Sequence, residues 1–250
     1  PGAAGLPEHV AAWKTVYGRL GIETESLHII PTCGAAEAIH MALFTVTDPG
    51  DEVLVVEPIY SGFSVIASIL GCQLVPVQTI FENQFQLPSN EAWEAKLTSK
   101  TKALILINPD NPTGRVLSRT ELERMAKFAH DHHLTLIVDE TYRDLFLRED
   151  VDRESALHLN MACESLILID SLSKRVGAPG MRIGVFVTYN KQLADQALKF
   201  AMSRSGTSRI EQRISIPLLT DGEELVKRNH AELQSRIDAM KDALRKIPDI

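Results

Sequence analysis

The sequence predicts an α/β fold of three layers, in which helices cover both faces of a mostly parallel, seven-stranded sheet. Short apolar runs recur along the chain with helical patterns between them, which is the alternation typical of a parallel sheet. Most of these runs are continuous rather than alternating, as expected for strands that are buried on both faces. The 250 residues suffice for one large domain or two smaller ones.

The elements follow from these patterns in chain order. The predicted strands are the runs Leu27–Ile30, Val53–Val56, Gln73–Val77, Ala103–Ile107, Leu134–Val138, Leu166–Ile169 and Ile183–Val187. The clearest helix begins at Ser118, which forms a capping box with Glu121 and is followed by an apolar face through Ala129. The other predicted helices are Leu6–Arg19, Ala35–Val46, Tyr60–Leu70, Glu91–Leu97, Lys191–Ser203 and a long one from Gly222 to Arg245.

The composition argues against several classes of protein. The net charge is −7 and lysine and arginine do not cluster, which argues against nucleic acid or an anionic membrane surface as a partner. No apolar run approaches the ~18 residues of a membrane-spanning helix. The cysteines, Cys33, Cys72 and Cys163, are far apart, which argues against a disulfide framework or a zinc site. We therefore expect a reducing, cytoplasmic location and no metal.

In a parallel sheet, ligands bind outside the carboxyl ends of the strands. Gly34, Ala35 and Ala36 follow the first strand and open a helix, where backbone amides can bind an anion. A tight turn explains the same residues. Tyr60 follows the second strand and either stacks on a flat ligand or covers the edge of the core.

Two further strand ends carry polar residues. Asn111 lies in the turn N-P-D-N-P-T-G, where two prolines can hold its amide in a fixed place, although a plain loop also uses these residues. Asp139 lies in the segment L-T-L-I-V-D-E, which resembles the Walker B strand of P-loop nucleoside triphosphatases, whose acidic residue binds magnesium. That alternative needs a G-x-x-x-x-G-K-[ST] loop, which the sequence lacks, and a G-x-G-x-x-G dinucleotide loop is also absent.

The stretch S-L-S-K-R-V-G-A-P-G-M-R-I-G follows the sixth strand. Ser171, Ser173 and Arg182 are residue types that bind an anion, and Lys174 between them is a candidate nucleophile. A lone lysine in a loop is more often a solvated charge. Here, however, it is one of five features that all lie at strand ends of one sheet.

Together these motifs resemble the class I/II aminotransferases, which are fold-type I enzymes that depend on pyridoxal 5'-phosphate (PLP). The resemblance covers nearly the whole chain, and its motifs occur in the family's order. The matching segments are G-A-A-E-A at Gly34–Ala38, E-P-I-Y at Glu57–Tyr60, N-P-D-N-P-T-G at Asn108–Gly114, D-E-T-Y at Asp139–Tyr142 and S-L-S-K…R-I-G at Ser171–Gly184.

The resemblance implies a role for each residue. Lys174 would bind the cofactor covalently and move the substrate Cα proton, and Asp139 would keep the pyridine nitrogen protonated. Asn111 and Tyr142 would hydrogen-bond the phenolic oxygen of the ring, and Tyr60 would stack on its face. The phosphate would be held by the turn at Gly34 and by Ala35, Ala36, Ser171, Ser173 and Arg182.

The resemblance also implies a larger assembly. Residues 1–245 would form the PLP-binding large domain, and residues 246–250 would begin a C-terminal small domain. The N-terminus does not resemble a signal peptide. The chain also lacks an initiator methionine, so we expect it to be part of a longer protein. The resemblance implies that this protein forms a homodimer.

The implied activity is transfer of an amino group between an amino acid and a 2-oxo acid. The S-L-S-K…P-G-x-R pattern also resembles aminocyclopropane-carboxylate synthases, which are lyases with the same cofactor. A third alternative is the aminotransferase-like sensor domain of a transcription regulator, which the acidic balance of the chain does little to support.

Overall fold

The computed structural model describes residues 2–145, 154–162 and 165–247. In this part of the chain the strands form one seven-stranded sheet of order β1-β7-β6-β5-β4-β2-β3. The strands are β1 (His28–Cys33), β2 (Glu52–Glu57), β3 (Gln73–Gln78), β4 (Thr101–Ile107), β5 (Thr135–Asp139), β6 (Leu166–Ser171) and β7 (Ile183–Thr188). Each predicted strand is present, with boundaries that differ by a few residues.

The sheet is mostly parallel, as predicted. The pairs β2–β3, β2–β4, β4–β5 and β5–β6 are parallel. Strand β7 is antiparallel to both of its neighbours, β1 and β6. The central strands β4, β5 and β6 therefore end at the same edge of the sheet, and their last residues carry side chains toward one place.

Helices and strands alternate along most of the chain, as the sequence patterns predict. The helices are α1 (Pro7–Arg19), α2 (Gly34–Val46), α3 (Ser61–Leu70), α4 (Asn90–Glu94), α5 (Arg119–Asp131), α6 (Leu172–Arg175), α7 (Lys191–Ser203), α8 (Arg209–Thr220) and α9 (Glu223–Leu244), with short 3₁₀ turns η1 (Phe81–Asn83), η2 (Ala156–Ala162) and η3 (Pro179–Met181). Helix α1 precedes the first strand, and α7, α8 and α9 follow the last one. The capping box of α5 is confirmed, because the Ser118 and Glu121 side chains each accept the other residue's backbone N–H.

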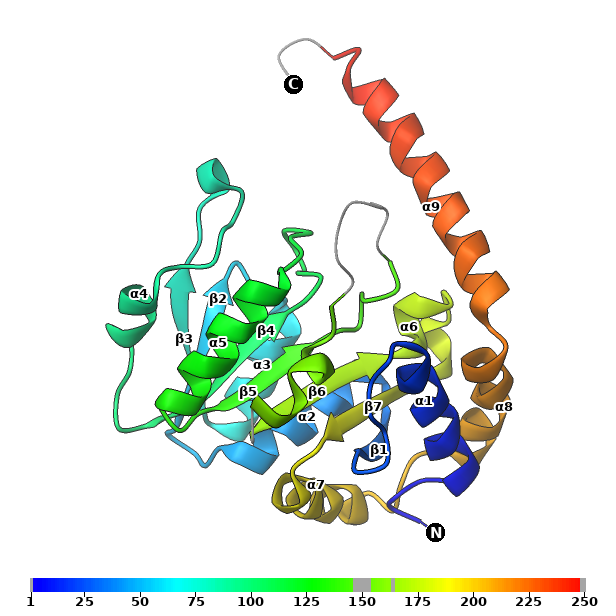
Figure 1. Ribbon diagram of the computed structural model, residues 1–250, viewed down its shortest axis with the longest axis horizontal. Helices are drawn as coiled ribbons and strands as arrows, with labels where there is room; N and C mark the ends of the chain where they lie inside the picture. Colours follow the sequence, from blue (N-terminus) through cyan, green and yellow to red (C-terminus); the bar gives the residue numbers. More distant parts are fainter. Residues whose placement is uncertain (1, 146–153, 163–164, 248–250) are drawn as a thin grey trace.

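Helices cover both faces of the sheet (Figure 1). A hydrophobic core lies on each face. In β4, Leu104 and Leu106 pack into the core that α1 and α5 cover, while Ala103 and Ile105 pack into the core beneath α2, α3 and α7. Successive residues of a strand point to opposite faces, so a strand that is buried on both faces reads as a continuous apolar run. The predicted three-layer α/β/α architecture is confirmed.

Helix α8 was not predicted. Pro217 lies inside it, and an internal proline argues against a helix when only the sequence is considered. The helix packs along α1, where Gln212, Ser215 and Leu219 are buried. Tertiary packing therefore overrides the weak local signal.

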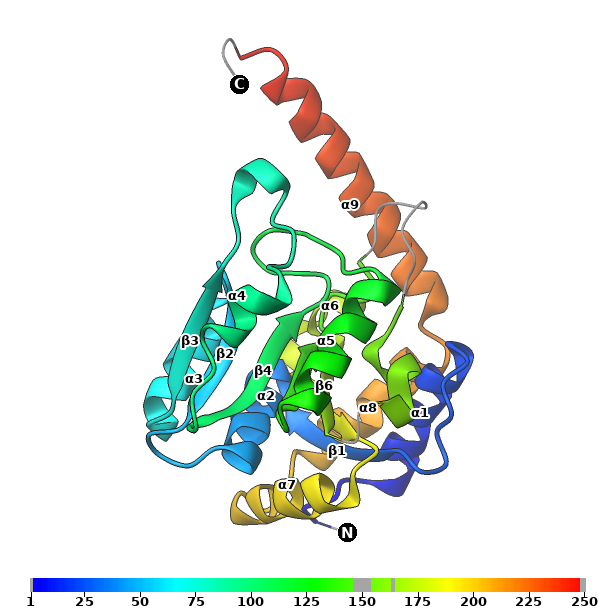
Figure 2. The same cartoon turned by 60° about the vertical axis from the view of Figure 1, so that its left-hand side comes forward.

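Helix α9 extends away from the body of the protein toward the C-terminus, as both ribbon views show (Figures 1 and 2). None of its residues is fully buried. Among the described residues, no helix combines the length and the apolar character needed to cross a membrane. Cys33 and Cys72 are free thiols, whereas Cys163 lies outside the described residues.

Candidate active site

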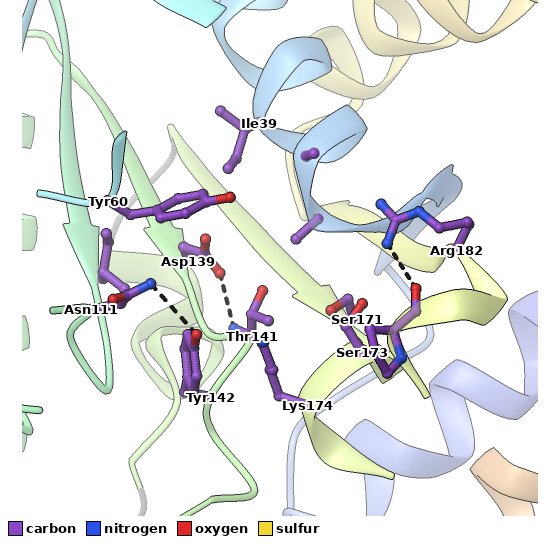
Figure 3. Close-up of a pocket in the computed structure, with 14 residues that line it drawn as sticks. Ile39, Tyr60, Asn111, Asp139, Thr141, Tyr142, Ser171, Ser173, Lys174 and Arg182 are labelled. Atoms are coloured by element: carbon purple, nitrogen blue, oxygen red, sulfur yellow. Dashed lines mark hydrogen bonds between the residues drawn. The ribbon is translucent and has the colours of Figure 1, made fainter. Parts of the chain in front are cut away.

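A cavity of about 210 Å³ opens at the carboxyl ends of the central strands (Figure 3). Every predicted site residue lines it except Gly34, which lies beside it. The lining residues are Ala35, Ala36, Ile39, Tyr60, Ile107, Asn111, Asp139, Thr141, Tyr142, Ser171, Ser173, Lys174, Pro179 and Arg182. The structure thus brings together, from α2 and several strand ends, side chains that are up to 147 residues apart in sequence, from Ala35 to Arg182.

At one end of the cavity the Arg182 guanidinium lies against the start of α2. Its Nη2 donates to the Cys33 carbonyl at 3.0 Å and its Nη1 donates to the Pro179 carbonyl at 2.9 Å. Gly34 has φ +74°, and a Cβ at this position would lie 2.3 Å from Arg182 Nη2. Glycine is therefore needed here both for the backbone conformation and for the space that the guanidinium fills.

The two serines of the same end come from β6 and the turn that follows it. Ser171 is the last residue of β6 and is buried, and its hydroxyl accepts the Ser173 N–H at 3.3 Å. Arg182, the two serines and the first turn of α2 thus surround one end of the cavity with hydrogen-bond donors. This is the donor set that binds a phosphate.

Asp139 ends β5 at the floor of the cavity and is 6% exposed. Its Oδ1 accepts the Thr141 N–H at 2.9 Å. Burial raises the pKa of the Asp139 carboxyl to about 6, and the nearby Asp170 adds to the shift, although the hydrogen bonds from Thr141 oppose it. A carboxylate held in this setting is well placed to interact with a cationic ring nitrogen.

Lys174 and three polar side chains line the middle of the cavity. Lys174 Nζ lies 5.6 Å from the centre of the Tyr142 ring. Asn111 Nδ2 donates to Tyr142 Oη at 3.5 Å, and burial, followed by the nearby Asp139, raises the pKa of the Tyr142 hydroxyl. The Tyr60 ring, 43% exposed, lies at the opposite wall in Figure 3.

Some lining residues were not predicted from the sequence. The Thr141 hydroxyl is buried in the cavity wall. Ile39 follows Ala35 by one helical turn, so the helix periodicity could have indicated it. Ile107 is the last residue of β4, and Pro179 lies within the Ser171–Gly184 stretch, so their place at the carboxyl end of the sheet could also have indicated them.

The magnesium-binding alternative for Asp139 finds no support in the geometry. Among residues 2–145, 154–162 and 165–247, no three His, Cys, Asp or Glu side chains are grouped so that they could hold a metal ion. In the described structure, the Asp139 carboxyl is held by Thr141, whose backbone N–H donates to Oδ1.

Comparison with known proteins identifies the family. A family model described as aminotransferase class I and II matches residues 2–250. The chain belongs to the aminotransferase class I and II family. This family depends on PLP, and the resemblance predicted from the sequence motifs is confirmed.

Individual members of the family resemble the chain over most of its length. An LL-diaminopimelate aminotransferase from Dehalococcoides mccartyi is 31% identical over 253 residues, which cover 99% of this chain and 64% of the relative. The 1-aminocyclopropane-1-carboxylate synthase 2 of Solanum lycopersicum is 30% identical over 241 residues, which cover 89% of this chain and 48% of the relative. The crystal structure of an aromatic aminotransferase from Pyrococcus horikoshii has a TM-score of 0.88 at 28% identity, covering 97% of this chain and 65% of that one. The chain therefore spans about half to two thirds of the length of these relatives.

Proposed function

We propose that this chain is the cofactor-binding large domain of a PLP-dependent aminotransferase, which transfers an amino group between an amino acid and a 2-oxo acid. One observation carries the proposal. A single cavity combines a lysine, a buried aspartate and an anion-binding end, at Lys174, Asp139 and Arg182. The family membership and the aminotransferases among the relatives support it.

The residues present fit the cofactor. The cradle beside Gly34 admits no side chain, and the surrounding donors suit a phosphate. The phosphate would be held by the amides of Ala35 and Ala36 and by the side chains of Ser171, Ser173 and Arg182.

The remaining residues would hold the ring and act on the substrate. When bound, the cofactor supplies an electron sink for the electrons left behind at the substrate Cα. The Asp139 carboxylate would hold a proton on the ring nitrogen, while Asn111 and Tyr142 would bind the phenolic oxygen and Tyr60 would cover one ring face. Lys174 would bind the cofactor through Nζ until the substrate amino group displaces it, and the freed Nζ amine would then take the proton from the substrate Cα.

The domain organisation belongs to the same proposal. Residues 1–245 would form the large domain, and residues 246–250, of which 248–250 lie outside the described residues, would begin a small domain. We further propose a cytoplasmic homodimer that acts on small amino acids and 2-oxo acids without nucleic acid or membrane partners.

Lyase chemistry is the second candidate function, because one relative is an aminocyclopropane-carboxylate synthase. Aminotransferases and these lyases both begin with removal of the Cα proton, so the cavity described above serves either reaction. The outcome depends on whether the proton returns to the cofactor or a substrate group leaves.

The test of the cofactor assignment is chemical. Full-length protein is loaded with PLP, reduced with borohydride and digested, and the modified peptide is identified by mass spectrometry. We expect the label on Lys174 and none in the Lys174→Ala variant. The Lys102→Ala and Lys191→Ala variants serve as controls and should keep the label. A label on Lys102 or Lys191, or no bound PLP in the unmodified protein, would contradict the proposal.

A further inference from the structure

Behind the cavity lies a group of charged side chains, which we call the buried ion cluster: Glu140, Arg143, Asp144, Asp170 and Arg175. Four residues of the proposed site each have a chain neighbour in this cluster. The neighbour pairs are Asp139 with Glu140, Tyr142 with Arg143, Ser171 with Asp170, and Lys174 with Arg175. In each pair one residue lines the cavity and the adjacent residue in the chain belongs to the cluster.

Arg143 is the centre of the cluster. Its side chain is 3% exposed, and its Nη2 donates to Asp170 Oδ2 at 2.7 Å. Its Nη1 donates to Glu140 Oε2 at 3.3 Å. The guanidinium therefore connects the segment after β5 to the end of β6, which are the two segments that carry Asp139 and Ser171.

A helix on the same face holds the cluster from a third side. The Tyr17 hydroxyl of α1 donates to Asp170 Oδ2 at 3.2 Å. The Arg143 guanidinium lies over the Tyr17 ring, 5.2 Å from its centre. A planar guanidinium stacks on an aromatic ring and donates to two carboxylates at once, whereas an ammonium group cannot do both in a fixed geometry.

Backbone pairing alone does not extend far enough to hold the two segments together. The register of β5 and β6 ends at Asp139 and Ile169. One more bond follows, from the Glu140 N–H to the Ile169 carbonyl at 2.8 Å. Past that point, in the part of the chain that the structure describes, the Arg143–Asp170 pair continues the connection between Tyr142 and Ser171.

Burying these charged side chains costs folding free energy, so stability alone does not explain the cluster. Burial raises the pKa of Glu140 to about 7, against the opposing effect of Arg143, and burial also raises the pKa of Asp170. Replacing a buried ion pair with apolar residues of similar volume is often neutral or stabilising. Because four members of the cluster are chain neighbours of site residues, the cluster points to a role in the geometry of the site.

We infer that Arg143 is a positioning residue, which fixes the Asp139–Tyr142 segment against the Ser171–Lys174 segment so that both ends of the cofactor are held at once. The inference rests on the proposed function. A loss of this connection should loosen the site without removing any group that touches the cofactor, and a small misplacement of catalytic groups reduces rate by about 100-fold.

The experiment compares two variants in full-length protein, with PLP as the probe. In Arg143→Lys, a positive charge remains to balance Asp170, so the protein should fold. We expect its PLP affinity to fall about tenfold, which corresponds to about 1.4 kcal/mol. The visible circular dichroism of the bound cofactor should change, and kcat should fall while KM for the amino acid changes little. In Arg143→Met, the losses should be larger wherever the protein folds.

Arg115→Met is the matched control. Arg115 is another largely buried arginine, with its side chain 17% exposed and paired with Glu121. Its loss should lower stability and leave PLP affinity and the cofactor spectrum unchanged. An Arg143→Lys variant that binds PLP like the unmodified protein, with the same visible spectrum, would overturn the inference. Absence of PLP binding in the unmodified protein would instead contradict the proposed function.

Discussion

The Arg182 guanidinium fills the space that a side chain at position 34 would need: a Cβ there would lie 2.3 Å from Arg182 Nη2 and 2.8 Å from its Cζ. The two residues are 148 positions apart in sequence, from 34 to 182. The glycine lets the arginine reach the first turn of α2, where its guanidinium is held by two backbone carbonyls. The proposed anion-binding end of the site therefore requires both the absence of a side chain at position 34 and the Arg182 guanidinium.

Gly34→Ala should weaken PLP binding, because the new methyl group must displace the Arg182 guanidinium. We expect at least a tenfold loss of affinity, or about 1.4 kcal/mol, measured by titration of the visible absorbance of bound PLP. Part of any effect will come from the backbone, since Gly34 has φ +74°.

Gly21→Ala separates these two contributions. Gly21 has φ +79°, and nothing lies within 4 Å of the position where its Cβ would be. It should lose stability by about 1 kcal/mol and keep its PLP affinity. If both alanine variants bind PLP equally well, the contact with Arg182 does not matter for the cofactor.

Asp139→Asn should make the cofactor-free protein more stable at alkaline pH while it lowers turnover. Burial raises the pKa of Asp139 from the ordinary value of 3.8 to about 6. A carboxyl whose pKa is raised on folding contributes stability below about pH 4 and loses it as the pH rises to 6. The loss approaches about 3 kcal/mol above pH 6.

Urea unfolding of the cofactor-free protein at pH 4 and pH 8 measures this effect. The asparagine variant should gain about 2–3 kcal/mol at pH 8 and little at pH 4. Turnover at saturating PLP should fall about 10²- to 10³-fold, the usual effect of removing one preorganised charged or polar group. A variant that is less stable than the unmodified protein at pH 8 would mean that the buried charge is compensated by groups other than Thr141.

The sequence predicted the sheet and most of the residues that line the candidate site for a physical reason. Strands buried on both faces leave continuous apolar runs, and the residues at their ends are read directly from the chain. Asp139 and Ser171 are the last residues of β5 and β6, and Lys174 follows in the next turn, so the strand assignment located all three. The resemblance to the family then assigned their roles.

The remaining features depend on contacts between distant parts of the chain. Tyr17 and Asp170 are 153 residues apart, and neither residue has a pattern that predicts their hydrogen bond. Arg143 directly follows the D-E-T-Y motif, and from the sequence alone it would be taken for an exposed charge. Only the fold shows that it is buried beside Asp170. Helix α8 was missed because its stability comes from packing against α1 and not from its own sequence.

An isotopic label on the amino nitrogen of the substrate can distinguish transamination from the lyase reaction. Full-length enzyme is given an amino acid with isotopically labelled nitrogen and an unlabelled 2-oxo acid. Transamination predicts that the label appears in the amino acid made from the acceptor, with no free ammonia, because the amino group is held on the enzyme between the two half-reactions. Release of ammonia, or of a substituent from the substrate side chain, would identify the lyase alternative. Lys174→Ala should lose either activity, so residual product from that variant would indicate a contaminating enzyme.

The burial of His9 should make the protein less stable in acid. The side chain is fully buried on α1, with its ring edge against Trp13 at a centroid distance of 6.5 Å. Neither ring nitrogen has a hydrogen-bond partner among the described residues. Burial lowers the pKa of His9 from 6.5 to about 4, although the nearby Glu8 opposes the shift.

His9→Phe should therefore stabilise the protein, most of all in acid. A group whose pKa is lowered on folding contributes stability above its ordinary pKa, and this contribution is lost as the pH falls from 6.5 toward 4. The loss of folding stability reaches about 3 kcal/mol in the unmodified protein. Phenylalanine does not titrate, so the variant avoids this loss and keeps an aromatic ring against Trp13. At neutral pH, removal of two unpaired buried nitrogens should add about 1–2 kcal/mol to the free energy of unfolding.

Urea unfolding at pH 7.5 and pH 4.5 measures both effects. The control is His40→Phe, because His40 is half-buried and packs on Phe200. If His9→Phe and the unmodified protein lose stability equally between these two pH values, His9 does not titrate as its burial predicts.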